Sequence, residues 1–520
     1  MTFRLAAPAI FIASLLLLPF LNKPFTIDDP LFLREAKHAL SDPAHPADFE
    51  QVWNAGDRLK LSQFLVGGTL PAYVLAPVAA LGNLEWVAHL YQLLLLCGFL
   101  LATVSVARRL GCDARQANTV GLLVGSNPVT LAMASTCMPD VMAMTFGMAG
   151  MDRILLFREE HGRLAGIAGG FLLAAAVLCR ASTAPLLAVA MLLLMPSSWK
   201  RAPRCLWPLA LAGTAVLAIA SLNRGPAANA TALASFQMLT SMRNVPRNLV
   251  AFLCFQALTG PVLAYWLLSG GRNFALAAGA VIALGVALSM VTSSANLLLY
   301  AVPAALGICF LAACMGMVRD LRGSLPLMVW LGAGLVALPY VHMAAKYLLP
   351  GVPAAALLIV LHGARVRQQR FPLTIALLVA LGWISGAMIV KGDATLAGSQ
   401  RDAVRNLIAP RIQRGVKVWA GGQWAFLYYA EEAGARALGN TPPLPDPGDY
   451  VVISRLDYYG QFERLPVNRE LLYTWKDERC GAFVLNRRMS AGFYSIRFGY
   501  LPFAAGCGEV NAYDLYRVLP

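Results

Sequence analysis

The stretch LAAPAIFIASLLLLPFLNKPFTIDDPLFLREAKHAL, residues 5–40, decides the organisation of the chain. Residues 5–21 form an apolar run long enough to cross a bilayer as one helix. No small-residue cleavage site follows this run, so we expect a first membrane span that stays in the protein and not a signal peptide. Two adjacent carboxylates, Asp28 and Asp29, come directly after the span.

The rest of the chain is also strongly apolar. Of the 520 residues, 58% are hydrophobic and only 13% are charged, about half the charged share of ordinary globular proteins, which excludes an ordinary cytosolic enzyme. The net charge of +15 comes largely from basic clusters between apolar runs, as the positive-inside rule expects of cytoplasmic loops, so we predict no nucleic-acid partner. The clusters are Arg108, Arg109 and Arg115; Lys200, Arg201 and Arg204; Arg319 and Arg322; and Arg365, Arg367 and Arg370.

Apolar runs of membrane-spanning length recur along the first three quarters of the chain and predict an α-helical polytopic membrane protein with about thirteen helices. The segment 64–81 is apolar but broken by glycines and prolines, so we expect it to be re-entrant or interfacial. With a cytoplasmic N-terminus, this count places loop 22–63 and the C-terminus outside. The runs are 5–21, 84–107, 117–136, 140–157, 164–179, 182–196, 205–222, 249–268, 274–291, 297–317, 325–343, 347–362 and 372–390.

A change in composition divides the chain near residue 390. Charged residues are about twice as frequent after this point, so we predict a membrane domain over 1–390 and a small extracytoplasmic α/β domain over 391–520. Within the second domain we expect a strand at 416–422, a helix at 423–438 and a strand at 449–456. Its two cysteines, Cys480 and Cys507, are predicted to form a disulfide, because an oxidising compartment permits one.

Acidic residues are concentrated in the loop 22–63, which holds seven of the 14 that precede residue 391. The segment 30–40 that follows Asp28 and Asp29 has amphipathic helical spacing, suited to lying on the membrane surface. The pair has two compatible interpretations: carboxylates held at the external interface for chemistry, or a helix N-terminal cap before Pro30.

Three further charged residues are predicted to lie at external ends of spans: Asp140, Arg180 and Lys346. A carboxylate facing lipid is costly, so Asp140 should face a polar cavity. The two cations either snorkel toward water or converge on an anion such as a lipid phosphate. A divalent cation held by Asp28, Asp29 and His38 is a further hypothesis, although no metal motif stands out.

Several segments, in this order, resemble landmarks of the GT-C glycosyltransferases, specifically the bacterial dolichyl-phosphate-mannose protein mannosyltransferase-like group (family 39) and the related aminoarabinose transferases. They are FTIDDPLFLREAKHAL, MPDV, LCRASTAP, KYLLPGVP and, in the C-terminal domain, VWAGGQWAFLYYAEEAGARAL, PGDYVVISR and GFYSIRFGYLPF.

This resemblance implies a hexosyl or pentosyl transferase that uses a polyprenyl-phosphate sugar as donor and inverts the anomeric carbon. It implies that Asp28 is the catalytic aspartate, with Asp29 as its acidic neighbour. Substrate-binding roles fall by the same resemblance on Asp140, Arg180, Lys346 and Tyr347. The family's Lys-Pro-Pro-Leu stretch appears here as GGTLPAY, with Arg58 or Lys60 as substitutes for its lysine, and Gln423 stands where a histidine is expected.

We therefore expect an enzyme of the bacterial cytoplasmic membrane that acts on an unidentified lipid, protein or glycan acceptor. Its partners are the donor, this acceptor and membrane lipids. Two other hypotheses stay open: a transporter or flippase of a lipid-linked sugar, and a noncatalytic relative with a role in envelope assembly. The sugar, the acceptor, any metal requirement and the oligomeric state do not follow from the residues.

Overall fold

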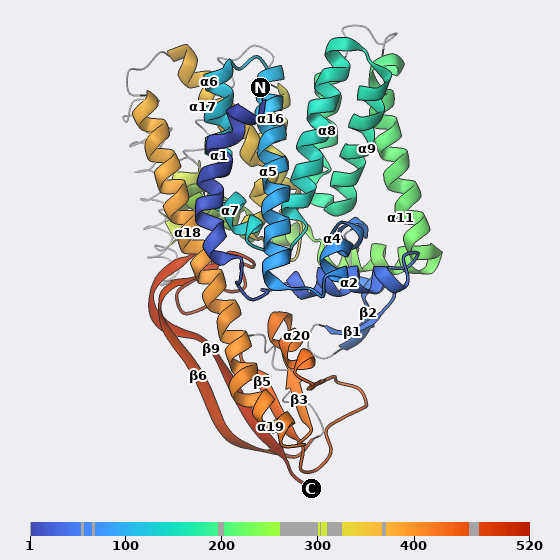
Figure 1. Cartoon of the computed structure of the whole chain (residues 1–520), viewed down its shortest axis with the longest axis vertical. Coiled ribbons are helices and arrows are strands. Elements are labelled where there is room, and N and C mark those ends of the chain that lie inside the picture. The colour runs from blue at the N-terminus through green and yellow to red at the C-terminus, as the bar shows by residue number, and fades with distance from the viewer. Residues whose placement is uncertain are drawn as a thin grey trace.

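A computed structural model describes residues 2–53, 57–64, 68–195, 202–259, 300–301, 303–308, 325–366, 371–456 and 467–520. Figure 1 shows a bundle of helices along the long axis of the molecule, with a C-terminal sheet domain at one end and the N-terminus at the other. The bundle includes α1 Thr2–Leu17, α5 Glu85–Arg109, α6 Ala114–Gly125, α8 Asp140–Glu160, α9 Arg163–Cys179, α11 Ala202–Leu239, α17 Val352–Val366 and α18 Phe371–Ala403.

The described residues contain about five clear membrane spans, so the expected number of thirteen is wrong. They are Thr2–Phe20, Glu85–Arg109, Ala202–Ile219, Ala345–Gly363 and Phe371–Gln413.

The predicted span 117–136 shows one physical reason why the structure has fewer clear spans than expected. It divides into α6 and α7 Pro128–Ala134, because the Asn127 side chain accepts hydrogen bonds from two backbone amides of α7 and starts a new helix there. Other apolar runs form helices of 17 residues or fewer, such as α9 and α10 Pro185–Leu194. The predicted run 274–291, and most of 297–317, lie outside the described residues.

The first loop after α1 lies across the end of the bundle that faces the sheet domain (Figure 1). The short helix η1 Leu18–Phe20 extends α1, and the expected amphipathic helix is α2 Asp29–Ser41, which buries Leu31, Leu33 and Ala36. A hairpin of β1 Glu50–Trp53 and β2 Asp57–Lys60 follows, then α3 Leu61–Phe64 and α4 Leu70–Ala80. With 11 residues, α4 rises about 16 Å, roughly half of the hydrocarbon core, so it is too short to cross.

Short elements connect the long helices in the second half of the bundle and after α9. They are η3 Ala181–Thr183, η5 Met242–Asn244, α12 Val245–Thr259, α16 Leu325–Leu331, η6 Gly332–Ala337 and η7 Ala345–Gly351. The segment 338–344 between η6 and η7 is attached on one side to α12, where the Asn248 side-chain amide donates to the carbonyls of Leu338 and Tyr340. On the other side, its Met343 carbonyl accepts from the backbone N–H of Ile496.

The C-terminal domain is a five-stranded mixed sheet of order β4-β3-β5-β9-β6. The expected strand, helix and strand are β3 Val418–Gly421, α20 Trp424–Glu432 and β5 Tyr450–Ser454. The long antiparallel pair β6 Arg469–Phe483 and β9 Ala504–Val518 was not expected. The smaller elements are η8 Val404–Ile408, α19 Ala409–Gln413, β4 Arg436–Ala437, β7 Leu485–Asn486 and β8 Ala491–Gly492.

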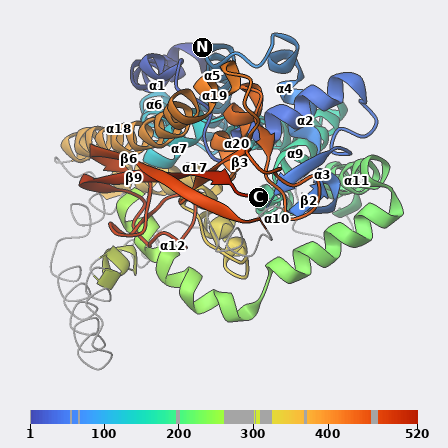
Figure 2. The same cartoon turned by 90° about the horizontal axis from the view of Figure 1, so that it is seen from below.

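One feature connects this domain to the bundle, and another links two of its own strands. Helix α18 continues without a break through residue 390 and extends into the sheet domain (Figure 1), so the expected boundary falls inside a helix. The predicted disulfide is confirmed: Cys480 and Cys507 are directly opposed on β6 and β9 and are bonded. Figure 2, seen from below, shows α20 in front of the bundle beside α2.

Candidate active site

Asp28 stands immediately before α2, and its carboxylate is turned toward a cation and not toward the helix. The side chain makes no capping hydrogen bond, so the interpretation of Asp28 as a side-chain cap is wrong. One carboxylate oxygen lies 3.5 Å from Nζ of Lys346, in η7. The Asp28 side chain retains 27% of its exposure, whereas that of Lys346 retains 7%. A partly exposed carboxylate next to a buried cation is open to a ligand.

The neighbouring Asp29 is buried completely and has a different role. Its two oxygens accept hydrogen bonds from the backbone N–H groups of Thr26, at 3.0 Å, and Cys137, at 2.7 Å. Burial raises the pKa of Asp29 to about 7, against the opposing influence of Lys23 and the two amides. Asp29 therefore joins the start of α2 to the turn that carries Asp140.

Asp140 and Arg180 form an ion pair at the same end of the bundle. Asp140 is the first residue of α8 and Arg180 follows α9, and their Oδ1 and Nε atoms are 2.8 Å apart. This contact lacks hydrogen-bond geometry: the other oxygen of Asp140 and the Arg180 Nε are buried and have no hydrogen-bond partner among the described residues. Because such atoms are costly to leave unpaired, they indicate a polar ligand.

The predicted convergence of Arg180 and Lys346 is seen in the structure. The Arg180 guanidinium lies over the ring of Tyr347, 5.5 Å from its centroid, and Tyr347 follows Lys346 in η7. The Asp28 carboxylate also lies close enough to Arg180 for its negative charge to raise the pKa of the guanidinium. Neither cation snorkels, because their side chains are 16% and 7% exposed. Two carboxylates, two cations and a phenol therefore meet from four segments of the chain.

Three other predicted residues make their contacts elsewhere. Arg58 on β2 donates to the Ala437 carbonyl at 3.2 Å, and Lys60 pairs with Asp48 at 2.8 Å on the surface. His38 stacks on Phe49 in the last turn of α2, about 14 Å along the helix from Asp29. One ion cannot be held by Asp29 and His38 across that distance, and the described residues contain no cluster of three metal-ligating side chains.

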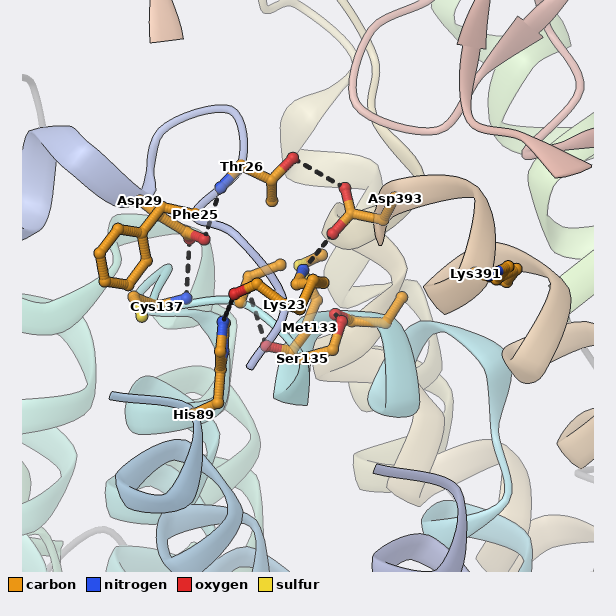
Figure 3. Close-up of polar contacts among 12 residues, drawn as sticks. Lys23, Phe25, Thr26, Asp29, His89, Met133, Ser135, Cys137, Lys391 and Asp393 are labelled. Atoms are coloured by element: carbon orange, nitrogen blue, oxygen red, sulfur yellow. Dashed lines mark hydrogen bonds and ion pairs between the residues drawn. The ribbon is translucent and has the colours of Figure 1, made fainter. Parts of the chain in front are cut away.

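A buried polar network that sequence reasoning missed holds the loop before Asp28 in place (Figure 3). Lys23 forms an ion pair with Asp393 of α18, with both side chains almost fully buried. The other oxygen of Asp393 accepts from the Thr26 hydroxyl at 3.0 Å and from the Tyr494 hydroxyl at 2.9 Å. His89 contacts the Lys23 carbonyl at 2.9 Å.

The C-terminal domain contributes a second attachment to this loop. The Tyr429 hydroxyl accepts from the backbone N–H of Phe25 at 2.8 Å, and it donates to Glu85 at 2.5 Å.

The position of Asp393 was a signal that sequence reasoning could have used. An acid just after an apolar run is costly unless it is paired, and Lys23 is the cation at the end of the first run.

Comparison with known proteins identifies the fold. No family model and no curated protein sequence matches the chain. Its structure is similar to the crystal structure of ArnT from Cupriavidus metallidurans bound to undecaprenyl phosphate, with a TM-score of 0.55 and 12% identity, over 90% of this chain and 95% of that one.

Two archaeal structures have the same architecture. One is the Archaeoglobus fulgidus oligosaccharyltransferase in the apo form, with a TM-score of 0.50 and 12% identity, over 84% of this chain and 64% of that one. The other is AglB of the same organism in complex with an inhibitory peptide and a dolichol-phosphate. It has a TM-score of 0.50 and 12% identity, over 87% of this chain and 69% of that one. The chain therefore has a GT-C-like fold, with several membrane spans and a C-terminal mixed sheet.

Proposed function

We propose that this protein is a membrane glycosyltransferase that moves a sugar from a polyprenyl-phosphate donor to an acceptor hydroxyl, with inversion at the anomeric carbon. The observation that carries the proposal is the pairing of the partly exposed Asp28 carboxylate with Lys346, beside Arg180 and Tyr347. The fold supports it, because one solved structure of this architecture holds undecaprenyl phosphate and another a dolichol-phosphate. Membership of the protein mannosyltransferase-like group stays a prediction.

In the proposed mechanism Asp28 is the general base. The acceptor oxygen forms a bond to the anomeric carbon while Asp28 takes its proton, and the bond from that carbon to the phosphate oxygen breaks with its electron pair. An acceptor hydroxyl is a poor nucleophile at neutral pH, so a carboxylate within hydrogen-bond reach accelerates the attack. The polyprenyl phosphate leaves with one additional negative charge, and no ATP is needed.

Lys346 and Arg180 would stabilise this leaving phosphate. Both cations are mostly buried, and a buried cation stabilises developing negative charge more strongly than one in bulk water does. Tyr347 has a phenol within the same group, and Asp140 orients Arg180 through their ion pair. Asp29 would act as a positioning residue, because both of its oxygens are used by backbone amides.

We propose that the site lies on the extracytoplasmic side of a bacterial cytoplasmic membrane. The membrane domain over 1–390 would bind the donor, and the domain over 391–520 would orient the acceptor. Arg58 and Lys60, on the hairpin strand β2, stay predictions as donor contacts, since their contacts are with Ala437 and Asp48.

The test is turnover of purified Asp28→Asn with a polyprenyl-phosphate sugar. Asn keeps the size of the side chain but accepts no proton, so we expect a loss of about 10² to 10⁴ in rate. Asp42→Asn, in the same loop and 44% exposed, is the matched control and should turn over like the wild type. Near-wild-type turnover by Asp28→Asn would contradict the proposal. A flippase or a noncatalytic relative would form no product even as the wild type.

A further inference from the structure

A small pocket lies between the first loop and the C-terminal domain, where α2, β1 and the start of α20 come together (Figure 1). The loop side of the pocket includes Ile27, Leu31 and Arg34, and the domain side includes Gln423 and Trp424. All of its lining residues fall outside the candidate spans, so the pocket belongs to the extramembrane part of the structure.

The pocket adjoins the proposed base. Ile27 and Pro30, which line it, are the neighbours in sequence of the pair Asp28 and Asp29. Consecutive Cα atoms are about 3.8 Å apart, so the wall that Ile27 forms is one residue away from Asp28. The Asp28 side chain is itself partly exposed. A ligand in the pocket therefore lies next to the group that would take a proton from the acceptor.

Two residues on opposite sides of the pocket have a left-handed backbone. The angle φ is 44° at Ile27 and 57° at Trp424. Bulky and β-branched residues rarely adopt positive φ, and such conformations persist only where the surrounding structure holds them. Strained residues of this kind cluster at functional sites, so the meeting of two of them at one pocket distinguishes it from an ordinary surface depression.

The lining of the pocket is polar but carries no free charge among the residues that the structure describes. Its charged residue, Arg34, forms an ion pair with Glu431, and the guanidinium lies over the Tyr428 ring, 5.6 Å from the centroid. The pocket therefore offers an anion no unpaired cation, which separates its chemistry from that of the site at Arg180 and Lys346.

The polar atoms of the pocket suit hydroxyl groups. Gln51 Oε1 is buried without a hydrogen-bond partner among the described residues, and an acceptor in this state is costly unless a ligand donates to it. A hydroxyl donates one hydrogen bond and accepts others, so it can pair with both atoms of a side-chain amide such as that of Gln51 or Gln423. The Trp424 indole adds a flat apolar surface on which the C–H face of a sugar ring can stack.

We propose that this pocket binds a neutral sugar ring of the acceptor, so that the acceptor is a carbohydrate. This inference rests on the proposed function, because it takes Asp28 to be the base that the acceptor hydroxyl meets. Trp424 would stack on the bound ring, and Gln51 would accept a hydrogen bond from one of its hydroxyls. The neighbouring sugar unit would present its hydroxyl at Asp28, where the oxygen bonds to the anomeric carbon of the donor and the proton passes to the carboxylate.

Binding of methyl glycosides to the purified full-length protein, measured by saturation-transfer NMR, tests the inference. The probes are the methyl glycosides of neutral hexoses, pentoses and N-acetylhexosamines. We expect the wild type to bind at least one of them, and Trp424→Leu to weaken this binding about 10 times through loss of the aromatic contact. Gln51→Leu has a similar size but no acceptor atom, and it should weaken binding about 2 to 10 times. Trp86→Leu, at a position 49% exposed at the start of α5, is the matched control and should bind like the wild type.

Two further measurements separate the proposed role from a structural one. Trp424→Leu and Gln51→Leu should bind undecaprenyl phosphate like the wild type, because neither residue belongs to the proposed donor site. Gln51→Leu, on the β1–β2 hairpin, carries the test alone if Trp424→Leu does not fold. Glucose 6-phosphate should bind no more tightly than methyl glucoside, because Arg34 is already paired, and tighter binding of the phosphate would contradict a neutral pocket.

The inference is overturned if none of the glycosides binds, if both variants bind them like the wild type, or if a peptide rich in serine and threonine occupies the pocket instead. Failure of the proposed function is distinguishable from these outcomes. In that case Trp424-dependent binding of a glycoside is seen in a protein that turns over no polyprenyl-phosphate sugar. If the inference alone fails, Asp28→Asn still loses turnover, whereas Trp424→Leu leaves the KM for the acceptor unchanged.

Discussion

Lys23 and Asp393, 370 positions apart in the chain, form a buried ion pair that fixes the loop before Asp28 to helix α18. The remaining oxygen of Asp393 is satisfied by Thr26 and Tyr494, so one carboxylate joins the first loop, α18 and the C-terminal domain. The position of the proposed base therefore depends on residues far away in sequence and not only on the helix that it precedes.

Asp393→Asn should destabilise the protein strongly, because it leaves the buried Lys23 without a counter-charge. Removing one partner of a buried pair typically costs about 3 to 5 kcal/mol. The double variant Lys23→Met, Asp393→Leu removes both charges and should recover much of this loss. Thermal unfolding of the two variants in detergent measures the difference. A double variant no more stable than Asp393→Asn would show that the charge imbalance is not the cause.

Asp29 should make stability depend on pH in the neutral range. Its pKa in the folded protein is raised to about 7, so between its ordinary pKa near 4 and pH 7 the folded state holds a proton that the unfolded state has released. Stability therefore falls as pH rises through this window, by at most about 1.4 kcal/mol per unit, and levels off above pH 7.

Asp29→Asn does not titrate and is the reference for this effect. The unfolding midpoint of the wild type should fall relative to that of Asp29→Asn as the pH is raised from 5 to 7. Midpoints that run parallel across this range would show that Asp29 is already ionised in the folded protein at pH 5.

Arg180→Gln should weaken binding of undecaprenyl phosphate by about 10 to 100 times, because a charged donor to the phosphate is lost. Arg180→Lys keeps the charge but not the forked geometry, so we expect an intermediate affinity. Arg163→Gln, at the exposed opposite end of α9, is the matched control and should bind normally. Equal affinities of Arg180→Gln and Arg163→Gln would remove Arg180 from the donor site.

The C-terminus should lie outside the cytoplasm. The C-terminal domain and the N-terminus are at opposite ends of the bundle (Figure 1), and Arg108 and Arg109 end α5 at the end where α6 begins, which is the N-terminal end. A reporter that is active only in the cytoplasm should be silent when fused after Pro520. The same reporter fused after Gly162, in the turn between α8 and α9, should be active. Activity after Pro520 would reverse the orientation.

The sequence alone determined the features that depend on local patterns. Amphipathic spacing predicted α2, since the side chains of a helix repeat every 3.6 residues whatever surrounds them. Short apolar segments bounded by glycine and proline predicted β3, α20 and β5, because these two residues mark the ends of elements within the local sequence. The low share of charged residues excluded an ordinary cytosolic enzyme, because apolar surface of this extent needs lipid around it.

The tertiary structure decided what neighbouring residues do. Asp28 and Asp29 are adjacent and chemically alike, yet one remains partly exposed opposite Lys346 and the other is buried under two backbone amides. Their difference arises because Asp29, the first residue of α2, packs against the backbone of Cys137, whereas Asp28 precedes the helix and faces Lys346. Apolar run length could not set the number of spans, since a cap such as Asn127 ends a helix wherever its side chain can bind the next backbone amides. The position of Asp393 just after an apolar run signals that this acid needs a partner, but the fold decides that the partner is Lys23, because a buried charge pairs with the group that packing brings within reach.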